Sequence, residues 1–210
     1  YKPENNSICS GQVLHCPYTF EKTRIVVREM AEMMALDLVD KGIVTDQMVL
    51  TVGYDIENLS DPVIRKAYKG EITIDRYGRS VPKHAHGTQN LSEFTNSTYE
   101  IIENTLKLYD RIINRDLLIR RITLTANHIK KEQDIVQKET YEQLDLFTDY
   151  AAVEKEKQEK EEKLQKEKKL QHAMLEIKKK YGKNAILKGT NFEEGATSID
   201  RNQRIGGHKA

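Results

Sequence analysis

Residues 117–129 read LLIRRITLTANHI, and their alternation decides the fold. Ile122, Leu124 and Ala126 are apolar and two positions apart, which is the spacing of side chains on one face of a β-strand. We therefore predict a strand with one buried face and one open face. The polar side chains of the open face are those of Arg121, Thr123, Thr125 and Asn127.

A helix and two further strands are expected upstream of this segment. Residues 20–42 carry apolar residues at helical spacing, and Gly42 follows as a stop signal. Residues 46–56 alternate as a half-buried strand, and residues 8–14 (ICSGQVL) are expected as another strand. The apolar positions are Val27, Met30, Met34 and Leu38 in the helix, and Met48, Leu50, Val52, Tyr54 and Ile56 in the strand.

The middle of the chain combines a polar excursion with a second helix. Residues 57–82 are rich in Gly, Asp and Pro, and EITIDRYGRS at 71–80 is expected to form a small hairpin. Residues 83–95 have the length of a strand, and a helix follows with a cap at Asn96 or Ser97. The apolar stripe of this helix is Ile102, Leu106, Tyr109 and Ile113.

The order strand, helix, strand, strand, helix, strand predicts an α+β fold. Two amphipathic helices would cover one face of a four-stranded antiparallel sheet. The other face is polar and weakly basic, so it is either solvated or a binding surface. The pattern alone favours solvation, because antiparallel sheets commonly leave one face in water.

The composition changes after the folded domain at residues 1–130. We expect residues 131–150 to be a flexible linker, 151–182 a long charged helix with Glu-to-Lys pairs four residues apart, and 183–210 a Gly-rich polar tail. The tail has too few apolar residues for a core of its own, so most of it is expected to be mobile. The end of the helix carries an apolar stripe, so the helix is either fully solvated or docks by its last turns. The stripe is Leu170, Met174, Ile177 and Tyr181.

Composition sets limits on the class of protein. The net charge is +1, so any surface that binds nucleic acid must be a local one. No apolar run approaches the roughly 20 residues of a membrane span, and no signal peptide is visible, so we expect a cytoplasmic protein without membrane contact. Cys9 and Cys16 are expected to be reduced thiols rather than a disulfide. The chain begins YKPENNS without Met, which suggests a piece of a longer protein.

Three segments, taken in order, resemble the little-finger domain of Y-family translesion DNA polymerases. They are NSICSGQVL at 6–14, PKHAHGTQNLSEFTNST at 82–98 and LLIRRITLTANHI at 117–129. The resemblance covers roughly residues 5–130 and implies binding to damaged primer–template DNA. The tail is similar to that of the UmuC-like, polymerase V-like branch found in Firmicutes, which implies a role in DNA repair and the SOS response.

The pentapeptide QLDLF at 143–147 lies between charged segments that cannot supply a core. Its apolar side chains are either docked on their own domain or kept for a partner. Placed after such a domain, it resembles the bacterial sliding-clamp-binding motif. The resemblance implies that Leu146 and Phe147 enter an apolar pocket of the clamp and that Gln143 contacts its rim. Leu144 would orient the backbone, and Asp145 would face outward.

For DNA binding, the family's basic pair on the last strand matches Arg120 and Arg121. Neighbouring strand residues point to opposite faces, so the two cannot act identically. We expect Arg121 on the polar face to contact a phosphate and Arg120 to reach from an edge. Such contacts are indifferent to base sequence. The further candidate DNA-binding residues are Ser7, Gly11, Lys83, His84, Gly87 and Thr88.

The pair His84 and His86 could also suggest a metal. No Cys, Asp or Glu cluster is evident near them, so we expect no metal site and take His84 as a phosphate or water ligand.

The resemblance also implies where the chemistry of the family lies. Palm carboxylates hold Mg²⁺ ions for two-metal phosphoryl transfer. This sequence contains no palm motif and begins near the end of the family's thumb, so we expect no catalytic residue, no cofactor in this chain and no polymerase activity from it alone. The expected partners are DNA, the sliding clamp and other SOS proteins through the helix and tail. The alternative is a non-enzymatic interaction protein that uses its long helix and tail to bind another protein.

Overall fold

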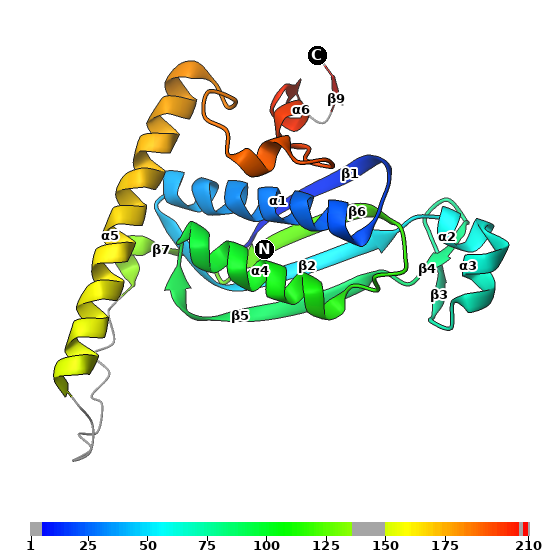
Figure 1. Ribbon diagram of the computed structural model, residues 1–210, viewed down its shortest axis with the longest axis horizontal. Helices are drawn as coiled ribbons and strands as arrows, with labels where there is room; N and C mark the ends of the chain where they lie inside the picture. The colour runs from blue at the N-terminus through cyan, green and yellow to red at the C-terminus, as the bar shows by residue number, and fades with distance from the viewer. Residues whose placement is uncertain (1–5, 136–149, 206–207, 210) are drawn as a thin grey trace.

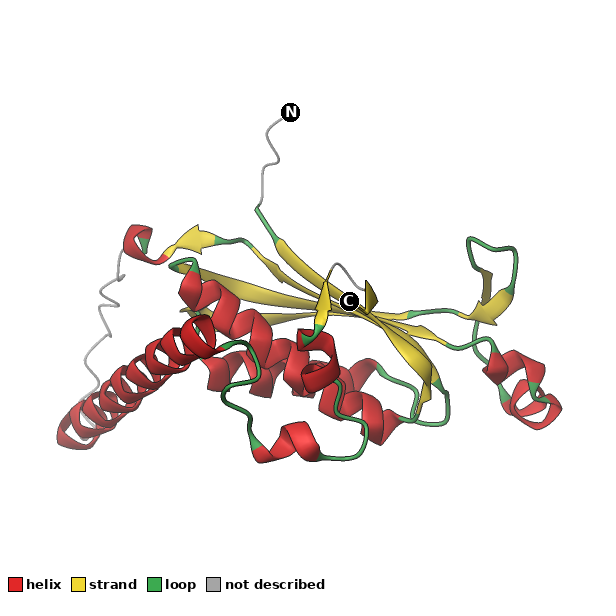
Figure 2. Ribbon diagram, turned by 90° about the horizontal axis from the view of Figure 1, so that it is seen from above, coloured by secondary structure: helices red, strands yellow, loops and turns green. Residues whose placement is uncertain are grey.

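The computed structural model describes residues 6–135, 150–205 and 208–209 (Figure 1). A sheet in the order β1-β6-β2-β5 forms its centre, and all neighbouring strands are antiparallel. Two long helices cover one face of the sheet (Figure 2). The elements of this domain are β1 (Ile8–Tyr18), α1 (Phe20–Asp40), β2 (Ile43–Tyr54), β5 (Ala85–Thr95), α4 (Thr98–Ile112) and β6 (Ile119–Asn127).

The predicted α+β class, with an antiparallel sheet and helices on one face, is confirmed. The strand count differs, because a short strand β7 (Lys130–Lys131) pairs with the start of β2 and makes the sheet five-stranded. The turn η1 (Glu132–Asp134) follows, and the Glu132 amide donates to the Gly42 carbonyl at 3.0 Å. The expected flexible linker therefore does not begin at residue 131. Residues 136–149 lie outside the described residues.

The alternation of β6 produces the core. Leu124 lies opposite Leu50 of β2, and Ile122 lies opposite Val52, so apolar side chains of both central strands share the helix-facing side. Ile122, Leu124 and Leu50 are all fully buried. The predicted face of α1 is also confirmed, since each of its apolar positions is buried. These positions are Val27, Met30, Met34 and Leu38.

The same register aligns the polar positions on the open face. Thr123 of β6 lies between Gly11 of β1 and Thr51 of β2, and His86 of β5 lies beyond Thr51. The Thr51 hydroxyl oxygen is 2.8 Å from Nδ1 of His86. The next row places Arg121 beside Gly53. Neither α1 nor α4 covers this face (Figure 2).

The polar excursion forms an arm at one end of the sheet, defined here as residues 57–82 (Figure 1). Its hairpin is confirmed, whereas its two short helices were not predicted. Asp61 begins the second of them, because its carboxylate accepts from the Val63 amide at 2.7 Å and Pro62 holds the first position. The hairpin rises on the open side of the sheet (Figure 2). The arm contains α2 (Glu57–Ser60), α3 (Pro62–Ala67), β3 (Ile72–Ile74) and β4 (Ser80–Pro82).

The long helix α5 (Tyr150–Tyr181) lies at the opposite end from the arm (Figure 1). Its docked face agrees with the predicted stripe only in part. Met174 is buried and Ile177 is half-buried as expected, but Leu170 and Tyr181 are 61% and 67% exposed, and Gln171 is buried in addition. The contact is largely polar. The Glu167 carboxylate accepts from Ser97 Oγ at 2.7 Å and from the backbone amide of Tyr99, in the first turn of α4, at 2.9 Å. Among the described helices, none is both long and apolar enough to cross a membrane.

The tail does not form a core of its own, yet its described part packs on α1. The carboxylate of Glu29, which is 4% exposed, accepts from the amides of Thr197 at 2.8 Å and Ser198 at 3.0 Å. It also accepts from Ser198 Oγ at 2.7 Å and Asn191 Nδ2 at 2.8 Å. The described residues of the tail therefore have specific partners on the folded domain, although the composition indicated a segment without them. The tail elements are η2 (Gly189–Phe192), α6 (Ser198–Asn202), β8 (Arg204–Ile205) and β9 (His208–Lys209).

We predict that Leu124→Ala lowers the free energy of unfolding by about 2–5 kcal/mol, because it leaves a cavity at a fully buried position of a central strand. Thr125→Ala, its neighbour on the open face, should change stability by less than about 0.5 kcal/mol. Urea denaturation followed by circular dichroism measures both. Equal losses in the two variants would contradict the assignment of the two faces.

We predict that Glu29→Ala releases the tail but leaves the sheet intact. The substitution removes the acceptor of five hydrogen bonds from residues 191–198. Limited trypsin digestion with mass spectrometry should show faster cleavage at Lys183 and Lys188, while fragments ending within residues 20–130 stay rare. Glu21→Ala, an exposed change on the same helix, is the matched control. Unchanged cleavage of the tail would contradict the role given to Glu29.

Candidate nucleic-acid interface

A cleft of about 780 Å³ lies where the open face meets the arm. The sheet contributes Thr51, Gly53 and Thr123, and the hairpin contributes Thr73 and Val81. Several basic side chains converge on this cleft from different parts of the chain. They are Arg76, Arg79, His84, Arg120 and Arg121.

A β-bulge brings the two adjacent arginines to the same cleft. Arg121 lies opposite Gly53, but Ile119 lies opposite Tyr54, so Arg120 is an extra residue in β6. Bulges redirect side chains in this way. The expectation that the pair points to opposite faces is therefore wrong here, because regular alternation stops at Arg120.

The two arginines differ in their partners. Arg120 Nε lies 3.7 Å from Oδ2 of Asp55, whose side chain is almost fully buried. Among the described residues, Arg121 has no carboxylate within ion-pair distance, and it is exposed. Arg121 is thus the more available cation, while Arg120 also neutralises a buried carboxylate.

The hairpin turn places an aromatic ring close to two cations. The guanidinium carbons of Arg76 and Arg79 lie 4.8 Å and 5.0 Å from the centre of the Tyr77 ring. Asp75 pairs with Arg79 at 2.7 Å and accepts from the Tyr77 amide at 2.8 Å, which fixes the turn. The hydrogen bond from Arg79 is the main cause that lowers the pKa of the Asp75 carboxyl, so the pair stays charged at neutral pH. The sequence alone did not indicate Arg76, Tyr77 and Arg79 as candidate site residues.

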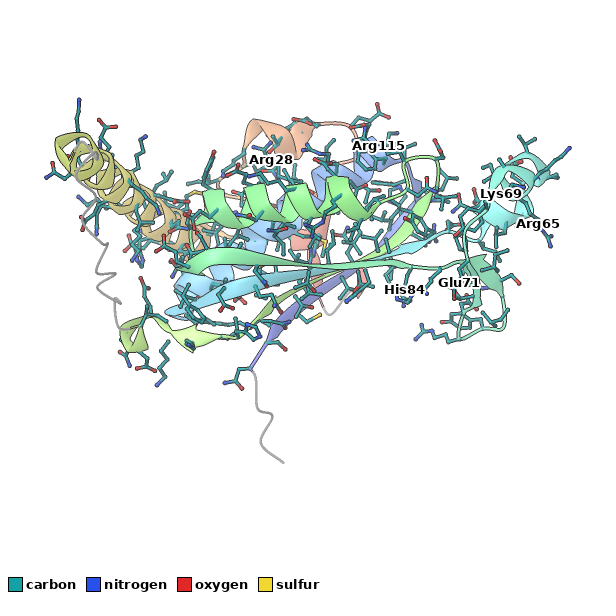
Figure 3. All side chains as sticks on the ribbon, turned by 90° about the horizontal axis from the view of Figure 1, so that it is seen from below. Arg28, Arg65, Lys69, Glu71, His84 and Arg115 are labelled. Atoms are coloured by element: carbon teal, nitrogen blue, oxygen red, sulfur yellow. The ribbon has the colours of Figure 1, made fainter. Side chains whose placement is uncertain are left out.

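Most of the other predicted DNA-binding residues are exposed. His84 lies at the junction of the arm and sheet, on the open side (Figure 3). Lys83 is exposed but pairs with Glu71 at 2.6 Å. Ser7 and Gly11 lie before and within β1, and Thr88 is on the outer strand β5, where its carbonyl accepts from Arg111 Nη2 at 2.9 Å. They are spread over the open face rather than gathered at one point.

Gly87 does not lie on the open face. An added Cβ would come within 2.9 Å of Ile112 Cγ2 and Leu108 Cδ1, both on α4. The glycine is required by the close approach of the helix, so it belongs to the packed side of the sheet. A contact from its backbone amide to a phosphate stays a prediction.

The basic side chains of the arm matter by their position rather than by net charge. Residues 57–82 contain five Lys or Arg residues and four acidic ones, Glu57, Asp61, Glu71 and Asp75, and the whole chain carries +1. Arg65 and Lys69 lie on the arm beyond the sheet, while Arg28 lies on the helix side (Figure 3). Exposed cations beside an open polar sheet suit a phosphate backbone, whose recognition is mainly electrostatic. Within the described residues, no group of three His, Cys, Asp or Glu side chains is placed to hold a metal ion.

The expected clamp-binding residues Gln143, Leu144, Asp145, Leu146 and Phe147 lie outside the described residues. Their role stays a prediction. The chain joins them on both sides to described elements, since η1 ends at Asp134 and α5 begins at Tyr150.

A sequence model of the impB/mucB/samB family C-terminal domain matches residues 5–146, which is more than half of the chain. The match includes the sheet, its two covering helices and the arm. No curated protein matches the chain. The chain therefore belongs to the impB/mucB/samB family, as the DNA-binding C-terminal region of a Y-family DNA polymerase, a class that acts in translesion synthesis and DNA damage tolerance.

Proposed function

We propose that this region holds an error-prone polymerase on primer–template DNA and on the bacterial sliding clamp during the SOS response. The observation that carries the DNA part is Arg121, an exposed cation on an uncovered polar face, at a cleft shared with Arg76 and Arg79 of the arm. Arginine presents a planar set of donors that matches a phosphate in a bidentate way. The open face and arm then contact the DNA backbone without reading bases.

The clamp part rests on the QLDLF motif. Burying Leu144, Leu146 and Phe147 would contribute about 1.5–3 kcal/mol each, and ordering the segment offsets part of that gain. A net of about 4–6 kcal/mol corresponds to a dissociation constant between about a millimolar and tens of micromolar. Such a weak contact becomes effective when DNA binding raises the local concentration. Membership of the UmuC-like branch of Firmicutes is part of this proposal.

A second candidate function is that of a protein-binding module. The observation that favours it is a set of exposed apolar side chains on α5, with Leu164, Leu170 and Tyr181 exposed by 37%, 61% and 67%. Another face of the same helix is bound to the domain, so a partner would take the outer one. An upstream reading frame that encodes palm carboxylates would select the polymerase over this alternative.

We predict that Arg121→Ala weakens binding to a labelled primer–template duplex about equally for different base sequences. Each lost phosphate contact should lower the slope of log K against log salt by about 0.9. Arg76→Ala should add a similar change in the double variant. Fluorescence anisotropy at several NaCl concentrations measures the slopes.

Arg28→Ala is the matched control, because Arg28 is an exposed arginine on the helix side. Wild-type affinity and slope in the double variant would remove the open face from the DNA interface.

We predict that changing Leu146 and Phe147 to Ala weakens binding to the sliding clamp by about 3–5 kcal/mol, because it removes most of the buried apolar area. Asp145→Ala should bind the clamp as wild type does. Surface plasmon resonance with immobilised clamp measures both, and DNA binding should be unchanged in each variant. Equal clamp binding by wild type and the double variant would sink the motif assignment.

A further inference from the structure

A second cleft, of about 720 Å³, follows the edge strand β1 and joins the open face to the docked tail. Arg121 and Thr123 line it from the sheet, and Lys183 and Arg201 line it from the tail. Its volume lies in the range of clefts that hold ligands. The tail is therefore part of the surface that borders the DNA-binding face.

Arg201 of α6 lies in this cleft without a matching anion. Its Nη2 donates to Ser10 Oγ at 2.7 Å, and its Nη1 donates to Gln12 Oε1 at 3.4 Å. Both acceptors are neutral, and no carboxylate pairs with Arg201 within the described part of the chain. Burial lowers the pKa of Arg201, and Glu29 is the carboxylate whose field acts against that change. The guanidinium still remains charged at neutral pH.

The charges around Arg201 leave the cleft positive. Arg121 and Lys183 are cations on its walls, and Asp200 is the one carboxylate among the residues that line it. His15 and Tyr18 are its other titratable side chains. The Glu29 carboxylate lies behind the tail and is occupied by hydrogen bonds from residues 191–198.

The tail holds Arg201 in place before any ligand arrives. Glu29 anchors the start of α6, and Gln12 Nε2 donates to Thr197 Oγ1 at 2.9 Å. A guanidinium whose position is already fixed loses little conformational entropy when it binds, and a charged hydrogen bond gains strength where water is partly excluded.

We propose that Arg201 and Lys183 form a phosphate-binding site for a DNA strand that crosses the open face and passes over β1. The site extends the interface onto the C-terminal tail, which the family match does not reach. It rests on the proposed DNA-binding function of the open face, because Arg121 lines both clefts.

The test uses the full chain and a labelled primer–template duplex in anisotropy titrations at several NaCl concentrations. Arg201→Gln should weaken binding about five- to tenfold, and Lys183→Gln should weaken it less, because Lys183 is exposed. Each should lower the salt slope by up to about 0.9. Asp200→Asn should strengthen binding, since it removes the opposing charge.

Arg201 also links the tail to β1, so limited trypsin digestion of each variant reports whether the tail stays docked. Suppose that digestion shows release of the tail in Arg201→Gln together with the loss of affinity for DNA. If Lys183→Gln and Asp200→Asn then bind DNA as wild type does, the role of Arg201 is structural and the proposal fails. If these three variants all bind as wild type while Arg121→Ala is weakened, the proposal fails and the function of the open face stands. If Arg121→Ala also binds DNA as wild type does, both this proposal and the proposed function of the open face fail.

Discussion

Strand β6 is hydrogen-bonded to β1 on one side and β2 on the other, and its register fixes both faces of the sheet. Ile122, Leu124 and Ala126 are fully buried beneath the helices, which leaves Arg121, Thr123 and Thr125 on the far side. A shift of one residue would exchange these two sets. The core and the DNA-binding face therefore depend on the same strand pairing. A change of register in β6 would disrupt both at once.

Periodic segments of the sequence predicted most of this domain. The alternation of β2 and β6 and the 3.6-residue spacing of α1 each reflect burial, which a single sequence records directly. Ile56 is an exception, because β2 ends at Tyr54 and Ile56 is the N-cap residue that precedes α2. The bulge at Arg120 and the close approach of α4 at Gly87 depend on neighbouring strands and helices, so no local pattern reveals them.

The candidate site was predicted only in part for a related reason. Arg120 and Arg121 stand out as a basic pair before an alternating run, but Arg76 and Arg79 reach the same cleft from a hairpin about 40 residues earlier. The sequence DRYGR carries the signal of a turn, with Gly78 at φ 76°, and not of a binding surface. Arg201 comes from a tail whose composition indicated mobility. The tail's contacts with Glu29 and Gln12 are polar and follow no periodic pattern, so the sequence alone does not reveal that it docks.

The docking of the tail through Glu29, Arg201 and Asn191 has a consequence for the energy landscape of the chain. Many of these contacts are hydrogen bonds, which undocking exchanges for bonds to water, so each contributes little net free energy. The free energy of opening should then be well below that of global unfolding. In hydrogen exchange the tail would behave as a separate cooperative unit, whose amides exchange while those of β6 remain protected. The β1 edge would then be covered and uncovered within the folded protein, without unfolding of the sheet.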